Sequence, residues 1–141
     1  MLGVWLIPAT TMKMRREHLV PLSTQALDVL RKMKERSRGS VYVFAADHRL
    51  DRYISENAVL ALIARMGYKG LLTGHGFRSI GSTWGNENGY NSDHIEMQLA
   101  HDSDDDIRGA YNNAKYLDRR RDMMQNYADW LDMRIQIVHP T

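Results

Sequence analysis

Five side chains stand out as groups suited to chemistry on a phosphate ester. In chain order they are Lys13, His75, Arg78, His101 and Tyr111. Cations and fixed hydrogen-bond donors stabilise the negative charge that spreads over the oxygens of a transferring phosphoryl group. A tyrosine hydroxyl can attack the phosphorus, and a lysine ammonium can protonate the departing oxygen. The set therefore predicts cleavage of a phosphodiester through a covalent intermediate.

The spacing of His75 and Arg78 suits joint binding of one phosphate. Residues three apart share a face if their segment is helical, and an arginine offers a planar pair of donors that matches phosphate oxygens. Tyr111 is the candidate nucleophile, and it needs a nearby positive charge or base because the ordinary pKa of a tyrosine is about 10. Tyr116 follows closely in the sequence and is the main alternative nucleophile.

His101 and Lys13 each have a simpler structural explanation. A histidine that ends a helix can satisfy free backbone carbonyls, and a lysine at the tip of a hairpin is usually only solvated. Lys13 nevertheless stands eight residues before Pro21 on a strand-like segment. That spacing makes it the candidate general acid for the leaving oxygen.

The first part of the chain is expected to form a β-hairpin followed by a helix. Residues 4–8 have the apolar character of a strand, residues 19–21 form its return, and the polar, basic residues 9–18 form the tip. Ser23 is expected to cap a helix whose apolar residues recur at helical spacing. These residues are Ala26, Leu27, Leu30 and Met33.

The middle of the chain alternates short apolar segments with turns. Residues 41–44 predict a short strand or a turn, and Ser55 is placed to cap the next helix, which ends at Gly67. That helix is apolar on most sides, so we expect it to be central. A further helix is predicted over residues 75–86, and a short one begins at Asn91 or Ser92.

A last helix is predicted over residues 115–134. Leu117, Met124 and Leu131 recur every seven positions. The preferred interpretation is packing against the core of the same domain, and the alternative is docking onto a neighbouring subunit. The face includes three further residues, Met123, Tyr127 and Trp130.

Composition is that of an ordinary globular domain. The chain has 141 residues, of which 43% are hydrophobic and 26% charged, so one domain is expected. It has no cysteine, which excludes disulfides. No apolar run approaches the length of a membrane-spanning helix. The first five residues contain no basic n-region of a signal peptide. We therefore expect a cytoplasmic protein without a membrane partner. A net charge of +2 does not by itself indicate nucleic-acid binding, although basic residues cluster at Arg15–Arg16 and Arg119–Arg121.

Several strings in the chain resemble the catalytic domain of tyrosine recombinases, the phage integrase family. The likeness is strongest to integrases of satellite phages and genomic islands, and it extends from about Trp5 to Asp132. The strings that carry it are Met12-Lys13, His18-Leu-Val-Pro21-Leu22, His75-Gly-Phe-Arg78, Ile95-Glu96, Leu99-Ala-His101, Ala110-Tyr111-Asn112, Arg119-Arg-Arg-Asp-Met-Met124 and Trp130-Leu-Asp132.

This resemblance implies a fold and an activity. The fold would be mainly α with a small antiparallel β-sheet. The activity would be site-specific DNA recombination through a 3′-phosphotyrosine formed by Tyr111, without metal or cofactor. The resemblance implies that His75, Arg78 and His101 hold the phosphate and Lys13 protonates the 5′ oxygen. Further DNA contacts are assigned to Arg15, Arg16 and Thr73. The expected partners are double-stranded DNA at attachment sites and other integrase protomers in a synaptic complex.

One feature of the family is missing from the sequence. The family uses another arginine ahead of the lysine hairpin, and residues 1–12 contain none. We therefore expect residues 1–141 to be a partial catalytic domain without the arm-binding and core-binding domains. Losing a charge-stabilising donor can cost about a hundredfold to a thousandfold in rate, so this chain alone is expected to be inactive or nearly so. The alternative is a DNA-binding remnant that does not cleave.

A metal-dependent nuclease is the other enzymatic alternative. His94 and His101 with the acidic residues at 102 and 104–106 could be read as ligands for a hard cation. The acidic run lacks the glycine and the terminal glutamate of a calcium loop, and its carboxylates fit the start of a helix better. We therefore give this alternative little weight.

Overall fold

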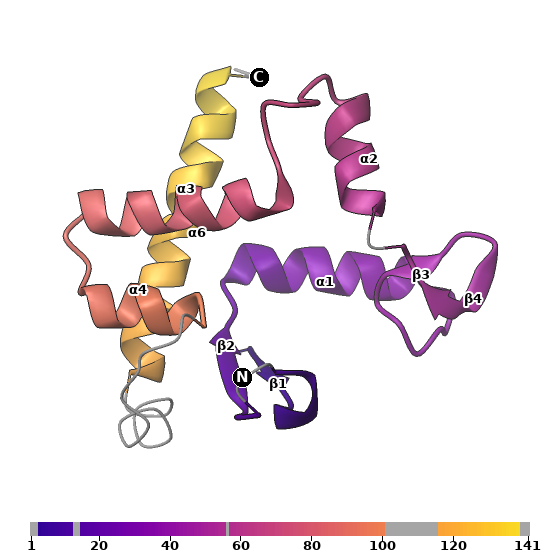
Figure 1. Ribbon diagram of the computed structural model, residues 1–141, viewed down its shortest axis with the longest axis horizontal. Coiled ribbons are helices and arrows are strands. Elements are labelled where there is room, and N and C mark those ends of the chain that lie inside the picture. Colours follow the sequence, from indigo (N-terminus) through magenta and orange to yellow (C-terminus); the bar gives the residue numbers. More distant parts are fainter. Residues whose placement is uncertain (1–2, 13–14, 56, 101–115, 139–141) are drawn as a thin grey trace. The chain divides into compact units, whose positions relative to one another are not determined.

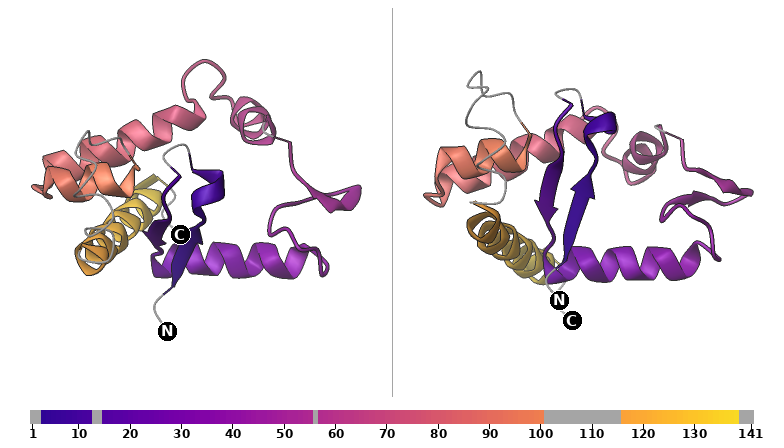
Figure 2. Two further views of the ribbon diagram at one scale, coloured as in Figure 1. Left: turned by 60° about the horizontal axis from the view of Figure 1, so that its bottom comes forward. Right: turned by 90° about the horizontal axis from the view of Figure 1, so that it is seen from below.

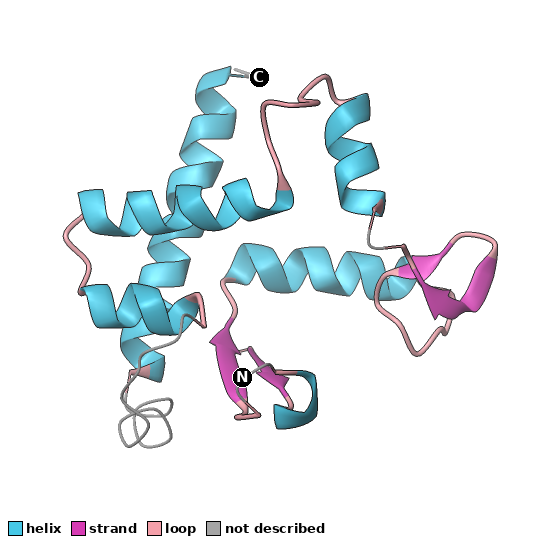
Figure 3. Cartoon of the chain, viewed as in Figure 1, coloured by secondary structure: helices cyan, strands magenta, loops and turns pink. Residues whose placement is uncertain are grey.

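The computed structural model describes residues 3–12, 15–55, 57–100 and 116–138 (Figure 1). The chain divides into two compact units. Unit 1 comprises Met1–Gln25 and Gly81–Thr141, and unit 2 comprises Ala26–Ile80. Over the described residues, helices predominate and a small antiparallel sheet lies near the start of the chain, as expected (Figure 3). A second two-stranded sheet, in the middle of the chain, was not predicted. None of the helices in the described part of the chain is long and apolar enough to cross a membrane.

Unit 1 begins with the predicted β-hairpin. Strand β1 (Val4–Ile7) pairs antiparallel with β2 (His18–Pro21), with Val4 opposite Pro21 and Ile7 opposite His18 (Figure 2). A short 3-10 helix, η1 (Ala9–Thr11), follows β1. Pro21 is fully buried, and β2 contacts the last helix, α6 (Leu117–Val138). The hairpin is therefore attached to the body of unit 1 through β2.

Aromatic and methionine side chains form the core of unit 1. They come from α3 (Gly74–Glu87), α4 (Ser92–Gln98) and α6. Trp84, Ile95 and Met123 are buried, and five half-buried residues pack against them: Tyr90, Leu99, Met124, Tyr127 and Trp130. The ring of Trp84 lies 5.0 Å from that of Tyr127 and 5.2 Å from that of Tyr90, within the range of favourable aromatic pairs. Packing of α6 against its own domain is thus confirmed for most of its predicted apolar face, whereas Leu131 is exposed.

Two glycines of α3 face this core at different distances. A Cβ added to Gly85 would lie 2.9 Å from Cδ1 and 3.0 Å from Cγ1 of Ile95, closer than real Cβ contacts allow. A Cβ added to Gly81 would lie 4.0 Å from the ring of Tyr127, which is ordinary contact. The absence of a side chain at Gly85 therefore allows the close approach of α4 to α3.

An amide and carboxylate cluster holds the start of α1 (Thr24–Arg36) against α6. The Thr24 backbone N–H donates to Gln125 Oε1 at 2.9 Å. Gln25 and Gln125 both donate through Nε2 to Asp129 Oδ1, at 2.8 and 2.9 Å. These two donors hold the pKa of the Asp129 carboxyl below its ordinary value of 3.8. The helix begins one residue after Ser23, close to where the sequence predicts.

Unit 2 contains most of α1, the strands β3 (Ala45–Ala46) and β4 (Arg49–Tyr53), helix α2 (Ala58–Arg65) and the first half of α3. Polar contacts tie its loops together. Ser40 Oγ donates to the Leu50 carbonyl at 2.6 Å, and Lys34 Nζ donates to the Ser40 carbonyl at 2.7 Å. The Ile54 N–H donates to the Phe44 carbonyl at 2.9 Å. Polar hydrogen bonds, more than an apolar core, hold this part of the fold together.

The prediction that α2 is central is wrong in this structure. Of its apolar side chains, Ile63 is buried, whereas Val59, Leu60 and Leu62 are each close to half exposed. Met66, directly after the helix, is 62% exposed. An apolar sequence predicts that a helix tends to be buried, but it does not identify the segment against which the helix packs.

The sequence also gave no indication of strand β4. Its residues are mostly polar and all are exposed, so the alternation that marks a half-buried strand is absent. Residues 41–44 form bends and turns, which is one of the two forms predicted for them, and the strand β3 begins immediately afterwards.

Candidate functional site

The start of α3 positions two of the predicted site residues. Thr73 precedes the helix, and its Oγ1 accepts a hydrogen bond from the Gly76 N–H at 3.1 Å. This is the usual N-cap contact, from the residue before the helix to the third residue inside it. A Cβ at Gly76 would lie 3.2 Å from Leu72 Cδ1, so the glycine fits the tight first turn. Thr73, expected at the DNA, thus has a structural role in ending the loop.

His75 and Arg78 lie in the first turns of α3 and both are exposed. Their spacing of three residues puts them on one face of the helix, as predicted. The free N–H groups and the dipole of a helix N-terminus also favour anions. An imidazole, a guanidinium and a helix N-terminus are therefore gathered within one short segment of unit 2, and this combination suits a phosphate.

Lys13, His101 and Tyr111 lie outside the described residues. Residues beside two of them adopt the left-handed backbone region: Arg15 has φ 50° and Ala100 has φ 51°. That conformation costs a residue with a Cβ about 1–2 kcal/mol. Such strain is typical of segments whose backbone conformation is held by the surrounding structure, and these segments include functional sites.

The remaining predicted residues differ in burial. Arg15 is exposed and Arg16 is half-buried, on the segment that leads into β2. Tyr116, the alternative nucleophile, is half-buried, and its ring lies 4.8 Å from that of His94 on α4. Tyr116 is therefore engaged in packing between α4 and the start of α6.

The role of Arg120 was not predicted from the sequence. Its side chain is fully buried, although it stands in a run of three arginines that we interpreted as a basic cluster. Arg120 Nη2 donates to the Leu19 carbonyl on β2 at 2.8 Å, and Nη1 donates to Gln98 Oε1 on α4 at the long distance of 3.5 Å. Desolvation by burial lowers the pKa of Arg120 from its ordinary value to about 10, so it stays charged at neutral pH.

The two neighbouring arginines behave differently because successive helical residues point about 100° apart. Arg119 is exposed, and Arg121 forms an ion pair with Asp118 one turn earlier. Arg120 instead shares its face with Met123, Met124 and Tyr127, which come three, four and seven residues later. That spacing was visible in the sequence and could have marked Arg120 as inward-facing.

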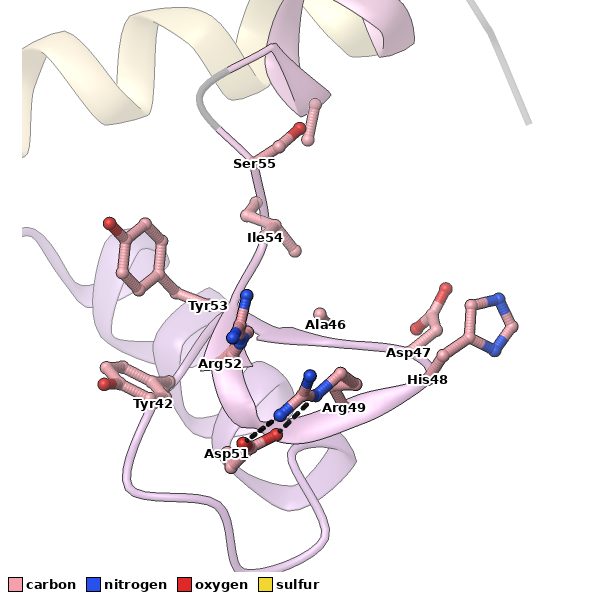
Figure 4. A pocket seen from close by; sticks show the side chains of 11 residues that line it. Tyr42, Ala46, Asp47, His48, Arg49, Asp51, Arg52, Tyr53, Ile54 and Ser55 are labelled. Atoms are coloured by element: carbon pink, nitrogen blue, oxygen red, sulfur yellow. Dashed lines mark hydrogen bonds and ion pairs between the residues drawn. The ribbon is translucent and has the colours of Figure 1, made fainter.

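A hollow in unit 2 lies beside the β3–β4 turn and the start of α2 (Figure 4). Tyr42 and Tyr53 line it on one side, and Asp47 and His48 lie at the turn. Arg49 and Asp51 neutralise each other through two hydrogen bonds, of 2.7 and 3.1 Å. None of the predicted site residues lines this hollow.

Within the described ranges, no group of three or more histidine, cysteine, aspartate or glutamate side chains is arranged to hold a metal ion. The residues of the metal alternative at positions 101–106 lie outside those ranges.

Comparison with known proteins decides the family. The model of the phage integrase family matches residues 2–117, which is well over half of the chain. The chain belongs to the phage integrase family. The matched range includes Lys13, His75, Arg78, His101 and Tyr111, the five candidates for phosphate chemistry.

Individual relatives agree with this assignment to the integrases. The "Integrase" of Shigella phage Sf6 and the "Prophage integrase IntS" of Escherichia coli (strain K12) are each 46% identical over 92% of this chain and 34% of their own length. The "Integrase" of Enterobacteria phage P4 is 42% identical over 86% of this chain and 29% of its own length. The chain thus spans about one third of the curated integrases that it matches. No solved structure matches it significantly.

Proposed function

We propose that residues 1–141 act as the catalytic part of a tyrosine recombinase, which cuts and rejoins DNA at specific sites for prophage integration and excision. The observation that carries the proposal is the family match over residues 2–117, because it spans all five candidate residues for phosphate chemistry. The names of the relatives support the same process, since they are called integrases.

The proposed reaction begins with attack of the Tyr111 hydroxyl oxygen on the phosphorus. The new bond joins the tyrosine to the 3′ phosphate, and the bond from phosphorus to the 5′ oxygen breaks. His75 accepts the proton of the tyrosine or donates to the phosphate, and Lys13 gives a proton to the leaving 5′ oxygen. A 5′ hydroxyl from another strand reverses these steps. The phosphotyrosine retains the energy of the original ester, so the cycle needs neither ATP nor a metal.

The first turn of α3 supports a phosphate-holding role for His75 and Arg78. Both are exposed on one helical face beside the capped helix start. A guanidinium can donate to two phosphate oxygens at once, and the helix N-terminus adds to the positive potential. His101 completes the proposed set that holds the phosphate.

The proposed partners are double-stranded DNA at attachment sites and other integrase protomers. Arg15, Arg16 and Thr73 are assigned to DNA contacts outside the reacting phosphate. Since phosphate contacts make protein–DNA binding salt-dependent, replacing Arg15 or Arg16 with glutamine should reduce the slope of affinity against salt concentration. The chain alone should react slowly, because no arginine precedes Lys13 in it.

A nicked DNA duplex that releases the cleaved end tests the proposal, because it traps the covalent intermediate. The chain should form a protein–DNA adduct that Tyr111→Phe abolishes. Tyr116→Phe is the matched control and should retain the adduct, since Tyr116 packs against His94. An adduct that persists in Tyr111→Phe would refute the assignment of the nucleophile. Salt-sensitive binding without any adduct would instead identify the chain as a DNA-binding remnant.

A further inference from the structure

The buried guanidinium of Arg120 joins three elements of unit 1. It projects from α6, donates at 2.8 Å to the Leu19 carbonyl on β2, and donates at 3.5 Å to Gln98 Oε1 on α4. Its side chain is 0% exposed. A guanidinium is planar and rigid, so its donors fix the direction of each partner as well as its distance.

Burial of this charge is expensive. Desolvation of a cation is unfavourable, and well-packed apolar residues often replace buried charged groups without loss of stability. Met123 on the same face is buried as an apolar residue, so an apolar side chain suits this interior. The presence of an arginine at position 120 is therefore better explained by the directional contacts that it makes than by stability alone.

The three joined elements lead directly to three of the proposed catalytic residues. Leu19 follows Lys13 by six residues, Gln98 precedes His101 by three, and Arg120 follows Tyr111 by nine. A displacement of about 1 Å in a catalytic group can cost about a hundredfold in rate. A directional contact between these elements can therefore increase the rate of catalysis by fixing their positions, which a purely apolar contact would do less strictly.

We propose that Arg120 is a positioning residue, which holds the lysine hairpin and the end of α4 in register with α6. In the sequence, these elements are connected to Lys13, His101 and Tyr111 over six, three and nine residues. The inference rests on the proposed function, but its geometric part can be tested without any activity.

Distance measurements between spin labels test the geometry. The chain has no cysteine, so labels can be placed on engineered cysteines at the exposed residues Thr10, Asp93 and Asp122. The pairs Thr10–Asp122 and Asp93–Asp122 should each give one narrow distance distribution. Arg120→Met should broaden both, whereas Arg119→Met, the same change at the exposed neighbour, should leave them unchanged. Equal widths in the two variants would overturn the proposal.

Arg120→Lys covers the case in which Arg120→Met fails to fold. It keeps the charge and a donor, but a lysine cannot present the paired donors of a guanidinium. We expect a distribution of intermediate width. A width equal to that of the unchanged chain would show that paired donation does not matter, and would overturn the proposal.

Cleavage kinetics test the link to Lys13. The nicked duplex is made with an ordinary bridging 5′ oxygen or with a bridging 5′ sulfur, which leaves without help from a general acid because a thiol has a pKa of about 8.5. Arg120→Met should slow adduct formation about 10-fold to 100-fold on the oxygen substrate and clearly less on the sulfur substrate. Arg119→Met should stay within about twofold on both.

The outcomes separate this proposal from the proposed function. An equal loss on both substrates would show that Arg120 does not act through the lysine hairpin. Absence of adduct in the unchanged chain would count against the proposed function, while the label distances would still decide whether Arg120 positions the three elements.

Discussion

The two units of this chain are held together by different kinds of contact. In unit 1, three aromatic rings lie 5.0 to 6.3 Å from the ring of Trp84. Buried Ile95 and Met123 complete the apolar core. In unit 2, Ile63 is the buried apolar residue among those described, and the buried serines Ser37 and Ser40 donate to the backbone carbonyls of Lys34 in α1 and Leu50 in β4. Apolar burial is the main stabilising term in folding, so unit 1 should be the more stable part.

This difference has a consequence for the candidate site. The described candidates His75 and Arg78 belong to unit 2. The helix α3 continues from one unit into the other, since the boundary falls after Ile80. The two phosphate-holding candidates on α3 are thus carried by a helix whose second half is anchored by Trp84.

The largest expected effect is at Trp84. Trp84→Ala should destabilise the fold by about 3–5 kcal/mol, because it leaves a cavity among the aromatic rings. Leu60→Ala in unit 2 is the comparison, and it should cost about 1 kcal/mol or less since Leu60 is 47% exposed. Urea unfolding followed by circular dichroism measures both. Similar losses at the two positions would contradict the difference between the units.

The glycines of α3 test how tightly unit 1 is packed. Gly85→Ala should cost about 1–3 kcal/mol through overpacking, since its Cβ would lie 2.9 Å from the buried Ile95 side chain. Gly81→Ala has room beside Tyr127 and should be neutral or stabilise by up to about 1 kcal/mol through helix propensity. Thermal unfolding of the two variants gives the comparison. A stabilised Gly85→Ala variant would mean that α3 and α4 are not in close contact.

The strained backbone before His101 predicts a gain in stability. Ala100 has φ 51°, which glycine adopts without steric cost. Relief of this strain stabilises the folded state, while the greater freedom of glycine stabilises the unfolded chain. The net effect of Ala100→Gly should be a stabilisation of unit 1 by about 0.5–1 kcal/mol. Urea unfolding measures this, with Ala61→Gly inside α2 as a control that should destabilise. A destabilised Ala100→Gly variant would contradict the left-handed conformation.

The smallest expected effect is the acid dependence of the contact between α1 and α6. Hydrogen bonds from Gln25 and Gln125 lower the pKa of Asp129 from 3.8, so the folded chain favours the carboxylate. The stabilisation is present above about pH 3.8 and is lost as the pH falls through the lower folded pKa. The stability difference between the unchanged chain and Asp129→Asn should shrink from pH 6 to pH 3. A difference independent of pH would contradict the predicted shift.

Much of the fold followed from sequence because its elements carry local signals. An apolar run and the closing Pro21 marked the hairpin, and apolar residues at helical or seven-residue spacing marked α1 and α6. The start of α4 was predicted at Asn91 or Ser92; the helix begins at Ser92, and Asn91 caps it by accepting from the Asp93 N–H at 2.7 Å. Signals of this kind reside in the residues that form the element, and no distant contact is needed to interpret them.

The features that were missed depend on distant contacts. Arg120 is identical in type to Arg119 and Arg121, and its burial depends on Leu19, about a hundred residues away. Strand β4 has no apolar face because both of its faces are exposed. The sequence did identify His75 and Arg78 as a pair on one helical face, and the structure confirms that placement. Their proposed roles, and those of Lys13, His101 and Tyr111, stay predictions.

The order in which unit 1 is synthesised affects how it can fold. Its β-hairpin comes from the first 25 residues, while α6, which packs against β2, begins at residue 117. A ribosome adds about 5–20 residues per second, so the completed hairpin waits on the order of 5–20 s for its partner helix. Trp84 is synthesised later than the hairpin, and it lacks its α6 partners Tyr127 and Trp130 for the last part of that time. Nascent chains that stop before α6 should therefore be prone to aggregation and degradation.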